Sequence, residues 1–224
     1  MFKPTDLFDL AQSEHAAIFD GCEHAWDALK KIKDYLAKNL RPALHNTCLG
    51  NAWVGENVFI GEGTVLEDGV MIKGPAIIGK NCQIRHNAYL REDVIIGDGC
   101  VVGNSCEFKN ALLFNGAQVP HFSYVGDSIL GFKAHLGAGV KISNLKLTPG
   151  NIGVEWDKKI IDTKLRKFGA MIGDHAVVGC NAVLNPGSVI GRDALVYPNT
   201  NWRGVLAPKH IAKNRATVEV SARR

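Results

Sequence analysis

Residues 54–108 divide into hexads that read VGENVF IGEGTV LEDGVM IKGPAI IGKNCQ IRHNAY LREDVI IGDGCV VGNSCE F. An apolar residue opens every hexad, and this run continues without a miss from Val54 to Phe114. The fifth residue of each hexad is small or β-branched, and the pattern resumes from Ile172 to Val196. A period of six fits neither a continuous helix nor a continuous amphipathic strand. The period therefore predicts short strands separated by tight bends.

Such repeats predict a mainly β fold, a parallel β-helix in which three hexads close one triangular coil of about 18 residues. Coils stack about 4.8 Å apart through parallel strand hydrogen bonds. Glycine, Asn and Asp supply the bends, where positive φ is needed. Residues one coil apart lie over one another, so Cys82 and Cys100 should stack in the interior. The general preference for right-handed crossovers does not predict a left-handed winding.

The composition argues against several classes of protein. The chain has 224 residues, 46% of them hydrophobic, with a net charge of +4 and only 8% aromatic residues. Scattered basic residues with few aromatics do not make a nucleic-acid footprint. We find neither an apolar stretch that could span a membrane nor a secretory signal, so we expect a cytoplasmic protein. The six cysteines contain no C-x-x-C pair, which favours reduced core residues over a zinc or redox motif.

We expect three parts: an N-terminal helical segment over residues 1–45, the β-helix over residues 46–205 and a C-terminal tail over residues 206–224. Apolar residues three or four apart predict an amphipathic helix over residues 24–40, which ends at Pro42. We expect this helix to cover an exposed strand edge at the start of the β-helix.

The hexad pattern is interrupted twice. Between Phe114 and Leu130 the apolar residues are spaced by five, six and five. Residues 146–169 show no hexad pattern and predict a long loop, which we expect to reach a neighbouring copy of the chain. Inside it, residues 151–163 predict a β-hairpin that turns at Asp157–Lys158. A long loop that leaves a regular solenoid is commonly functional.

The first interruption contains two candidate site residues. His121 and Tyr124 lie beside each other at a distortion in an otherwise regular wall. Histidine titrates near neutrality and can take a proton from an attacking amine. The alternative for a lone histidine is a surface or interface residue with no chemical role.

Two cations lie one coil apart. Arg91 and Lys109 should project together from one face, and stacked cations favour a bound anion such as phosphate. The alternative is that each cation pairs with a nearby acid, such as Glu92, Asp93 or Glu107.

The stretch H-F-S-Y-V-G-D, followed by G-A-G and an Asn, resembles the acetyltransferase domain of bifunctional glucosamine-1-phosphate N-acetyltransferase / UDP-N-acetylglucosamine pyrophosphorylase. It is also similar to the archaeal-type sugar-phosphate nucleotidyltransferases, whose C-terminal β-helix carries VPH-x-x-YVGDS. The resemblance covers roughly residues 48–205. It implies a left-handed β-helix of hexapeptide repeats and acetyl transfer from acetyl-CoA to an amino sugar phosphate in nucleotide-sugar biosynthesis.

The resemblance also implies roles for individual residues. His121 resembles the catalytic base, and Asn144 resembles the asparagine near the acetyl thioester. The residues that correspond to ligands of the sugar phosphate are Arg91, Lys109, Tyr124 and Lys167. The strip along which coenzyme A would lie corresponds to Gly137, Ala138 and Gly139.

Relatives of this kind are homotrimers with the active site between adjacent copies, and we expect the same here, with no bound metal. Two positions depart from the family pattern. His135 stands where the bacterial enzymes have an asparagine against the sugar, and Cys180 stands where they have a serine near the acetyl group. Cys180 falls at a bend, so we expect it to be exposed and do not assign it as a nucleophile. The Gly-rich motif of the nucleotidyltransferase half does not occur in these residues, so we expect no pyrophosphorylase activity from them.

Three other functions remain open. A γ-class carbonic anhydrase needs three histidines from two chains, two of them spaced H-x4-H. His86 and His121 lie 35 residues apart, but Gly126 stands where the H-x4-H partner of His121 would be. A non-catalytic scaffold or regulatory subunit would explain the departure at His135. An acyltransferase with another amino-sugar or nucleotide-sugar acceptor is the third.

Overall fold

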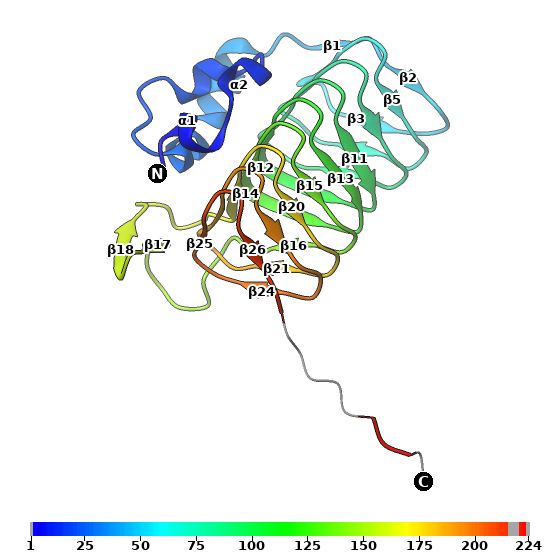
Figure 1. The fold of residues 1–224 in the computed structure, drawn as a ribbon. Helices are drawn as coiled ribbons and strands as arrows, with labels where there is room; N and C mark the ends of the chain where they lie inside the picture. The colour runs from blue at the N-terminus through cyan, green and yellow to red at the C-terminus, as the bar shows by residue number, and fades with distance from the viewer. Residues whose placement is uncertain (1, 215–219, 223–224) are drawn as a thin grey trace.

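The chain forms a stack of coils whose strands run in parallel along three faces (Figure 1). The computed structural model describes residues 2–214 and 220–222. Most hexads give one strand of two or three residues followed by a bend, as the period predicts. The predicted fold class, a left-handed parallel β-helix with an N-terminal helical segment and one long loop, is confirmed.

Each face has its own column of strands. The helix-covered face contains β1 (Ala43–Leu44), β4 (Val58–Ile60), β7 (Ala76–Ile78), β10 (Val94–Ile96), β19 (Ala170–Ile172), β22 (Ser188–Ile190) and β25 (Val205–Leu206). The histidine face contains β2 (Thr47–Cys48), β5 (Val65–Leu66), β8 (Gln83–Ile84), β11 (Val101–Asn104), β13 (Gln118–His121), β15 (His135–Leu136), β20 (Val177–Val178), β23 (Leu195–Val196) and β26 (Ile211–Ala212). The tyrosine face contains β3 (Trp53–Val54), β6 (Met71–Ile72), β9 (Tyr89–Leu90), β16 (Lys141–Ile142), β21 (Val183–Leu184) and β24 (Asn201–Trp202). Two longer strands, β12 (Glu107–Leu113) and β14 (Tyr124–Leu130), turn the corner from the tyrosine face to the helix-covered face.

The coil length changes inside the first interruption. Ile77 pairs with Ile95, eighteen residues on, but Ile95 pairs with Leu112, which is only seventeen residues on. Because the coil is one residue shorter, Leu113 points into the interior and Phe114 points out. The prediction that the inward run continues to Phe114 is therefore wrong by one residue.

The N-terminal segment is less regular than its sequence pattern predicts. Its elements are α1 (Pro4–Leu7), three 3-10 turns (Leu10–Gln12, Ala16–Phe19 and Ala25–Lys30) and α2 (Ile32–Asn39). One continuous helix over residues 24–40 is thus a wrong prediction. A 3-10 turn has three residues per turn, so Trp26 and Leu29 still share a buried side.

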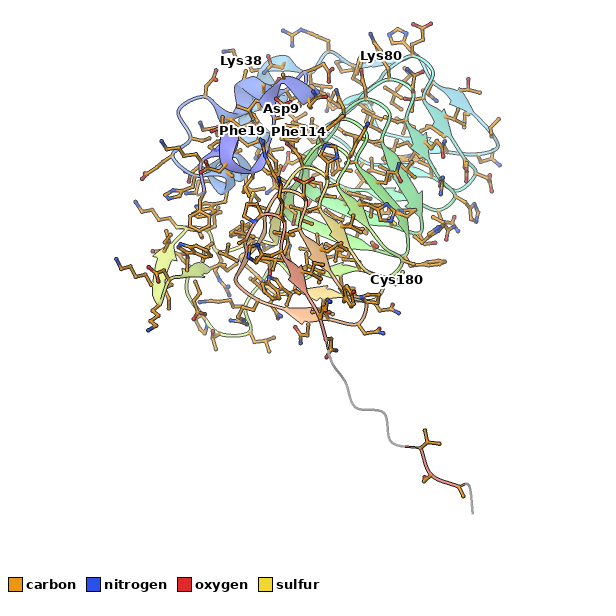
Figure 2. The ribbon with its side chains drawn as sticks, in the orientation of Figure 1. Asp9, Phe19, Lys38, Lys80, Phe114 and Cys180 are labelled. Atoms are coloured by element: carbon orange, nitrogen blue, oxygen red, sulfur yellow. The ribbon has the colours of Figure 1, made fainter. Side chains whose placement is uncertain are left out.

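This segment packs on the helix-covered face, where it lies beside the coils (Figure 1). The middle residues of the strands there are apolar and point outward, and the segment buries them: Ile77, Ile95, Leu112, Ile129, Met171 and Val189. Phe114 lies beside Phe19 in this contact (Figure 2), with ring centroids 5.9 Å apart. The buried carboxylate of Asp174 also holds the segment, since it accepts the backbone N–H of Asp9 at 2.6 Å. The predicted position over the strand edge is wrong: the segment lies on this outer face, where it buries outward-pointing apolar side chains.

The first and last coils extend beyond the predicted boundaries. β1 pairs with β4, so strand pairing begins at Ala43, and β26 pairs with β23, so it ends at Ala212. The tail that we predict from residue 206 therefore starts after Ala212, and its residues 215–219 and 223–224 lie outside the described part of the chain.

The second interruption contains the predicted hairpin. β17 (Gly153–Trp156) and β18 (Lys159–Asp162) are antiparallel, and Trp156 pairs with Lys159. Asp157 and Lys158 both have positive φ, as a two-residue hairpin turn requires. The hairpin packs on its own chain, since Lys30 Nζ donates to the carbonyl oxygen of Thr163 at 3.2 Å.

The interior confirms the predicted cysteine positions. Cys82 and Cys100 are both buried on neighbouring coils, and Cys180 is exposed at a corner away from the helical segment (Figure 2). None of the helices in the described residues has the length and apolar character to cross a bilayer.

Candidate active site

His121 ends strand β13 at a corner of the coil, and its side chain is exposed. Its carbonyl oxygen accepts the backbone N–H of Gly139 from the next coil at 3.0 Å and the hydroxyl of Ser123 at 3.0 Å. The following residue, Phe122, has φ of +51° and is 61% exposed, an unusual conformation for a bulky side chain. The corner therefore holds the His121 backbone firmly and leaves its imidazole open to a ligand.

His135 lies on the next coil of the histidine face, where it pairs with Gln118, three residues before His121. It opens β15 and is half-buried. Burial lowers the pKa of His135, and the nearby charge of His121 lowers it further. The residue predicted as the base and the residue that departs from the family pattern thus lie on neighbouring coils of one face, near enough for their charges to interact.

The predicted coenzyme A strip lies against the same corner. The backbone of Asn181 donates to the carbonyl oxygen of Ala138 at 2.8 Å, so Cys180 lies one coil beyond the strip. A Cβ at Gly137 would lie 2.7 Å from the backbone nitrogen of Cys180. A side chain at Gly137 would thus collide with the next coil. Gly137 and Gly139 are both buried, and Lys141 Nζ donates to the carbonyl oxygen of Gly139 at 2.7 Å. We call His121, His135, residues 137–139 and Cys180 the histidine corner.

A second group of polar residues lies at the far edge of the tyrosine face. The side chain of Asp127 is only 4% exposed, yet it accepts three hydrogen bonds. One carboxylate oxygen accepts Lys109 Nζ at 3.2 Å and Asn110 Nδ2 at 2.8 Å, and the other accepts Asn144 Nδ2 at 2.5 Å. We call Asp127, Lys109, Asn110, Asn144 and the neighbouring Tyr124 the Asp127 cluster.

Arg91 and Lys109 stack on adjacent coils as predicted, but both already have carboxylate partners. Arg91 contacts Glu107 at 3.1 Å and Glu92 at 3.3 Å, and the hydrogen bond that Arg91 donates to Glu107 raises the pKa of Arg91. Lys109 pairs with Asp127, an acid that was not among its expected partners. The alternative of local pairing is correct, and the stacked cations need no anion between them.

Tyr124 and Asn144 are held together inside the Asp127 cluster. Asn144 Nδ2 lies 3.3 Å from the Tyr124 hydroxyl. Burial raises the pKa of Tyr124, and the charges of Asp127 and Glu107 add to this shift. A Cβ at Gly126 would lie 2.5 Å from the Tyr124 hydroxyl, so glycine makes room for this contact.

Lys167 stands where the long loop rejoins the coils. The backbone N–H of Phe168 donates to the carbonyl oxygen of Asn144 at 3.0 Å, and Gly169 donates to that of Asp127 at 2.8 Å. Lys167 is exposed, and its ammonium has no hydrogen bond or ion pair within the described residues. This cation is available to a ligand beside Asn144.

The two groups are separate in the described part of the chain, where no side-chain hydrogen bond or ion pair joins the histidine corner to the Asp127 cluster. Sequence reasoning missed Asp127 and Asn110, although Asp127 lies inside the Y-V-G-D-S stretch. The signal available in the sequence is the residue type: Asp and Asn are enriched at corners with positive φ, and Asp127 and Asn110 have φ of +48° and +45°.

Within the described residues, no group of three or more His, Cys, Asp or Glu side chains is arranged to hold a metal ion. His86 is instead tied within its own corner, where Nδ1 lies 2.7 Å from the carbonyl oxygen of Asp68.

A family model described as the GMPPB C-terminal domain matches residues 72–214, which is more than half of the chain. The chain belongs to this family. The match includes every predicted site residue. The family assignment, together with the relatives below, confirms the resemblance to acetyltransferase domains of bifunctional sugar-phosphate enzymes.

Curated relatives of this GMPPB C-terminal domain protein include the bifunctional sugar-1-phosphate nucleotidylyltransferase/acetyltransferase of Sulfurisphaera tokodaii. It is 39% identical over 87 residues, which are 39% of this chain and 22% of the relative. The bifunctional protein GlmU of Methanococcus maripaludis strain C5 is 34% identical over 88 residues, 39% of this chain and 21% of the relative. The matched part thus spans about a fifth of the length of these relatives.

A solved structure with a similar fold is the UDP-N-acetylglucosamine acyltransferase of Campylobacter jejuni. It is 15% identical with a TM-score of 0.47, and the match covers 74% of this chain and 70% of that one. Another is a mutant of perosamine N-acetyltransferase from Caulobacter crescentus in complex with CoA and GDP-perosamine. It is 21% identical with a TM-score of 0.29, covering 81% of this chain and 57% of that one.

Proposed function

We propose that this protein is an acyl-CoA-dependent N-acyltransferase that moves an acetyl group from acetyl-CoA to the amine of an amino sugar phosphate. The observation that carries the proposal is the exposed imidazole of His121, whose backbone is held at a corner by hydrogen bonds from Gly139 and Ser123. Membership of the GMPPB C-terminal domain family and the bifunctional acetyltransferase relatives support it.

His121 is the general base in this proposal. An ammonium group cannot attack a thioester, so the acceptor nitrogen must lose a proton as its bond to the acyl carbon forms and the carbon–sulfur bond breaks. An imidazole within hydrogen-bond reach takes that proton and can return it to the departing thiolate. Its exposed ring and fixed backbone suit this role, whereas Cys180 needs no covalent part in direct transfer.

The acceptor phosphate is assigned to Lys167 and Arg91. Lys167 has no partner to give up among the described residues. Arg91 is 34% exposed and its acids Glu92 and Glu107 are similarly exposed, so these ion pairs are weak and a phosphate can replace them. Lys109 is only 17% exposed and faces the buried Asp127, so it stays in place and contributes charge at short range.

The complete site is proposed to need three copies of the chain, because relatives of this fold form symmetric trimers. The strands of the helix-covered face are not open to another copy, since their outward apolar residues are already buried with the N-terminal segment. The histidine face and the tyrosine face are the surfaces left for this contact. Such a contact would place the histidine corner of one copy against the Asp127 cluster of a neighbouring copy, and the two groups together would form one site.

The test of this function is acyl transfer by the purified protein. Acetyl-CoA would be mixed with glucosamine-1-phosphate, glucosamine and glucose-1-phosphate in turn, and thiol release and product mass would be measured. We expect an N-acetylated product from the amino sugar phosphate and none from glucose-1-phosphate. Binding of acetyl-CoA without acylation of either amine would contradict the proposal and favour a non-catalytic scaffold. The ion pairs that Arg91 and Lys109 form with carboxylates of the same chain also fit a scaffold.

A further inference from the structure

The side-chain amide of Asn144 has a fixed orientation. Asp127 accepts Lys109 Nζ at 3.2 Å, so its carboxylate is held as an anion that can only accept hydrogen bonds. The Asn144 atom that faces it must therefore be the amide nitrogen, and the 2.5 Å contact joins Asn144 Nδ2 to an Asp127 oxygen. The second N–H of the same amide is directed to the Tyr124 hydroxyl at 3.3 Å.

Both N–H groups of Asn144 are thus used inside the chain. The side-chain oxygen of Asn144, Oδ1, has no hydrogen-bond partner in the described residues, and it is not among the buried side-chain atoms that lack one. It is therefore open to solvent and to a ligand. An oxygen in this position accepts a hydrogen bond and cannot donate one, so Asn144 cannot stabilise an oxyanion.

The same carboxylate fixes the surroundings of Asn144. Lys109 and Asn110 come from β12, Asp127 comes from β14 and Asn144 follows β16, so the cluster ties three successive coils. The root of the long loop covers it, because Gly169 and Phe168 donate to the backbone carbonyls of Asp127 and Asn144. This burial keeps water from replacing the carboxylate as the partner of the amide.

We propose that Asp127 is a positioning residue that turns Asn144 into a hydrogen-bond acceptor for an N–H group of a bound substrate. The inference rests on the proposed function, because it names the group that this site recognises. Two sources supply such an N–H: the amine of the acceptor and an amide of the pantetheine arm of the acyl donor.

A double-mutant cycle tests the proposal. Asp127→Asn removes the anion and lets the Asn144 amide reverse, and Asn144→Ala removes the acceptor altogether. Each single change should lower kcat/KM about tenfold to a hundredfold, the range for one hydrogen bond to a charged group. Since Asp127 acts through Asn144, the double variant should lose no more than the worse single variant. Multiplied losses would overturn the proposal.

The values of kcat/KM for the two substrates distinguish the amine of the acceptor from the pantetheine amide. A loss confined to kcat/KM for glucosamine-1-phosphate identifies the amine, and a loss confined to acetyl-CoA identifies the pantetheine amide. Asp193→Asn is the matched control, because Asp193 is an exposed corner aspartate with φ of +57°. Its kinetics should match the wild type, and an equal loss there would contradict a specific role for Asp127.

A second variant covers the case in which Asp127→Asn does not fold. Asn144→Asp places two carboxylates together, which then share one proton. The kcat/KM profile should shift toward acid pH, which a purely structural role would not cause, and an unshifted profile would overturn the proposal.

Should the wild type prove inactive, the same cycle is measured as binding of glucosamine-1-phosphate and of acetyl-CoA by calorimetry. Wild-type binding that both single variants retain would then reject the role of Asp127.

Discussion

The ring of Phe114 stacks on the ring of Phe8, with centroids 5.0 Å apart and 25° between the planes. These residues come from the middle of the β-helix and from the start of the chain, and both are fully buried. Their contact holds the N-terminal segment on the helix-covered face. The histidine face and the tyrosine face therefore stay open.

Truncating this contact should destabilise the protein. Phe114→Ala should lower the free energy of unfolding by about 3–5 kcal/mol, because it removes a buried ring and leaves a cavity. Denaturant unfolding of both proteins measures the difference. Phe122→Ala is the matched control: its ring is 61% exposed, so the change should stay within about 0.5 kcal/mol. Equal losses for the two variants would contradict the packing of Phe114.

The hexad period predicts most of the fold, because each inward position is set by local chain geometry. It fails at Phe114, since Leu113 is also apolar and periodicity alone does not locate a one-residue deletion. The hairpin turn at Asp157–Lys158 was predicted correctly from local turn chemistry. The amphipathic pattern near Trp26 shows that one side is buried but does not identify the surface that buries it.

The candidate site was predicted less completely. The spacing of Arg91 and Lys109 shows that they stack. Their acid partners depend on how the corners are built where the coil length changes from eighteen to seventeen residues. Asp127 lies under a loop that rejoins the coils about forty residues later in the sequence, where Gly169 donates to its backbone carbonyl. No local pattern carries that information.

The proximity of His121 and His135 can be measured without any activity. Burial and the charge of His121 both lower the pKa of His135 below its ordinary value of 6.5. His121→Gln removes the neighbouring positive charge, so the pKa of His135 should rise while burial still holds it below 6.5. Proton NMR titration of the His135 ring measures this change. A pKa unaffected by the substitution would mean that the two rings do not interact.

Lys167 should contribute to binding of the acceptor. Lys167→Ala should raise the KM for glucosamine-1-phosphate about tenfold with little change in kcat, as expected when one charge-assisted contact to a phosphate is lost. The KM for acetyl-CoA should not change. Lys159→Ala, in an exposed residue of β18, is the control and should leave both constants unaltered. An unchanged acceptor KM in Lys167→Ala would remove this residue from the site.

The open histidine and tyrosine faces predict self-association into three copies. Sedimentation equilibrium at micromolar concentration should give a mass about three times that of the chain. Phe114→Ala loosens the N-terminal segment on the helix-covered face, which is not part of the proposed contact. The fraction of this variant that stays folded should therefore still form the three-copy assembly. A monomer under these conditions would contradict a site shared between copies.

The central claim is that His121 accepts the proton of the attacking amine. The most direct measurement is kcat for thiol release from acetyl-CoA with glucosamine-1-phosphate, followed across pH for the wild type and for His121→Ala. The account predicts a loss of about 10²–10⁴-fold in kcat, with acetyl-CoA binding nearly unchanged. Full activity of His121→Ala would contradict the account, and His135 would then be the next candidate for the base.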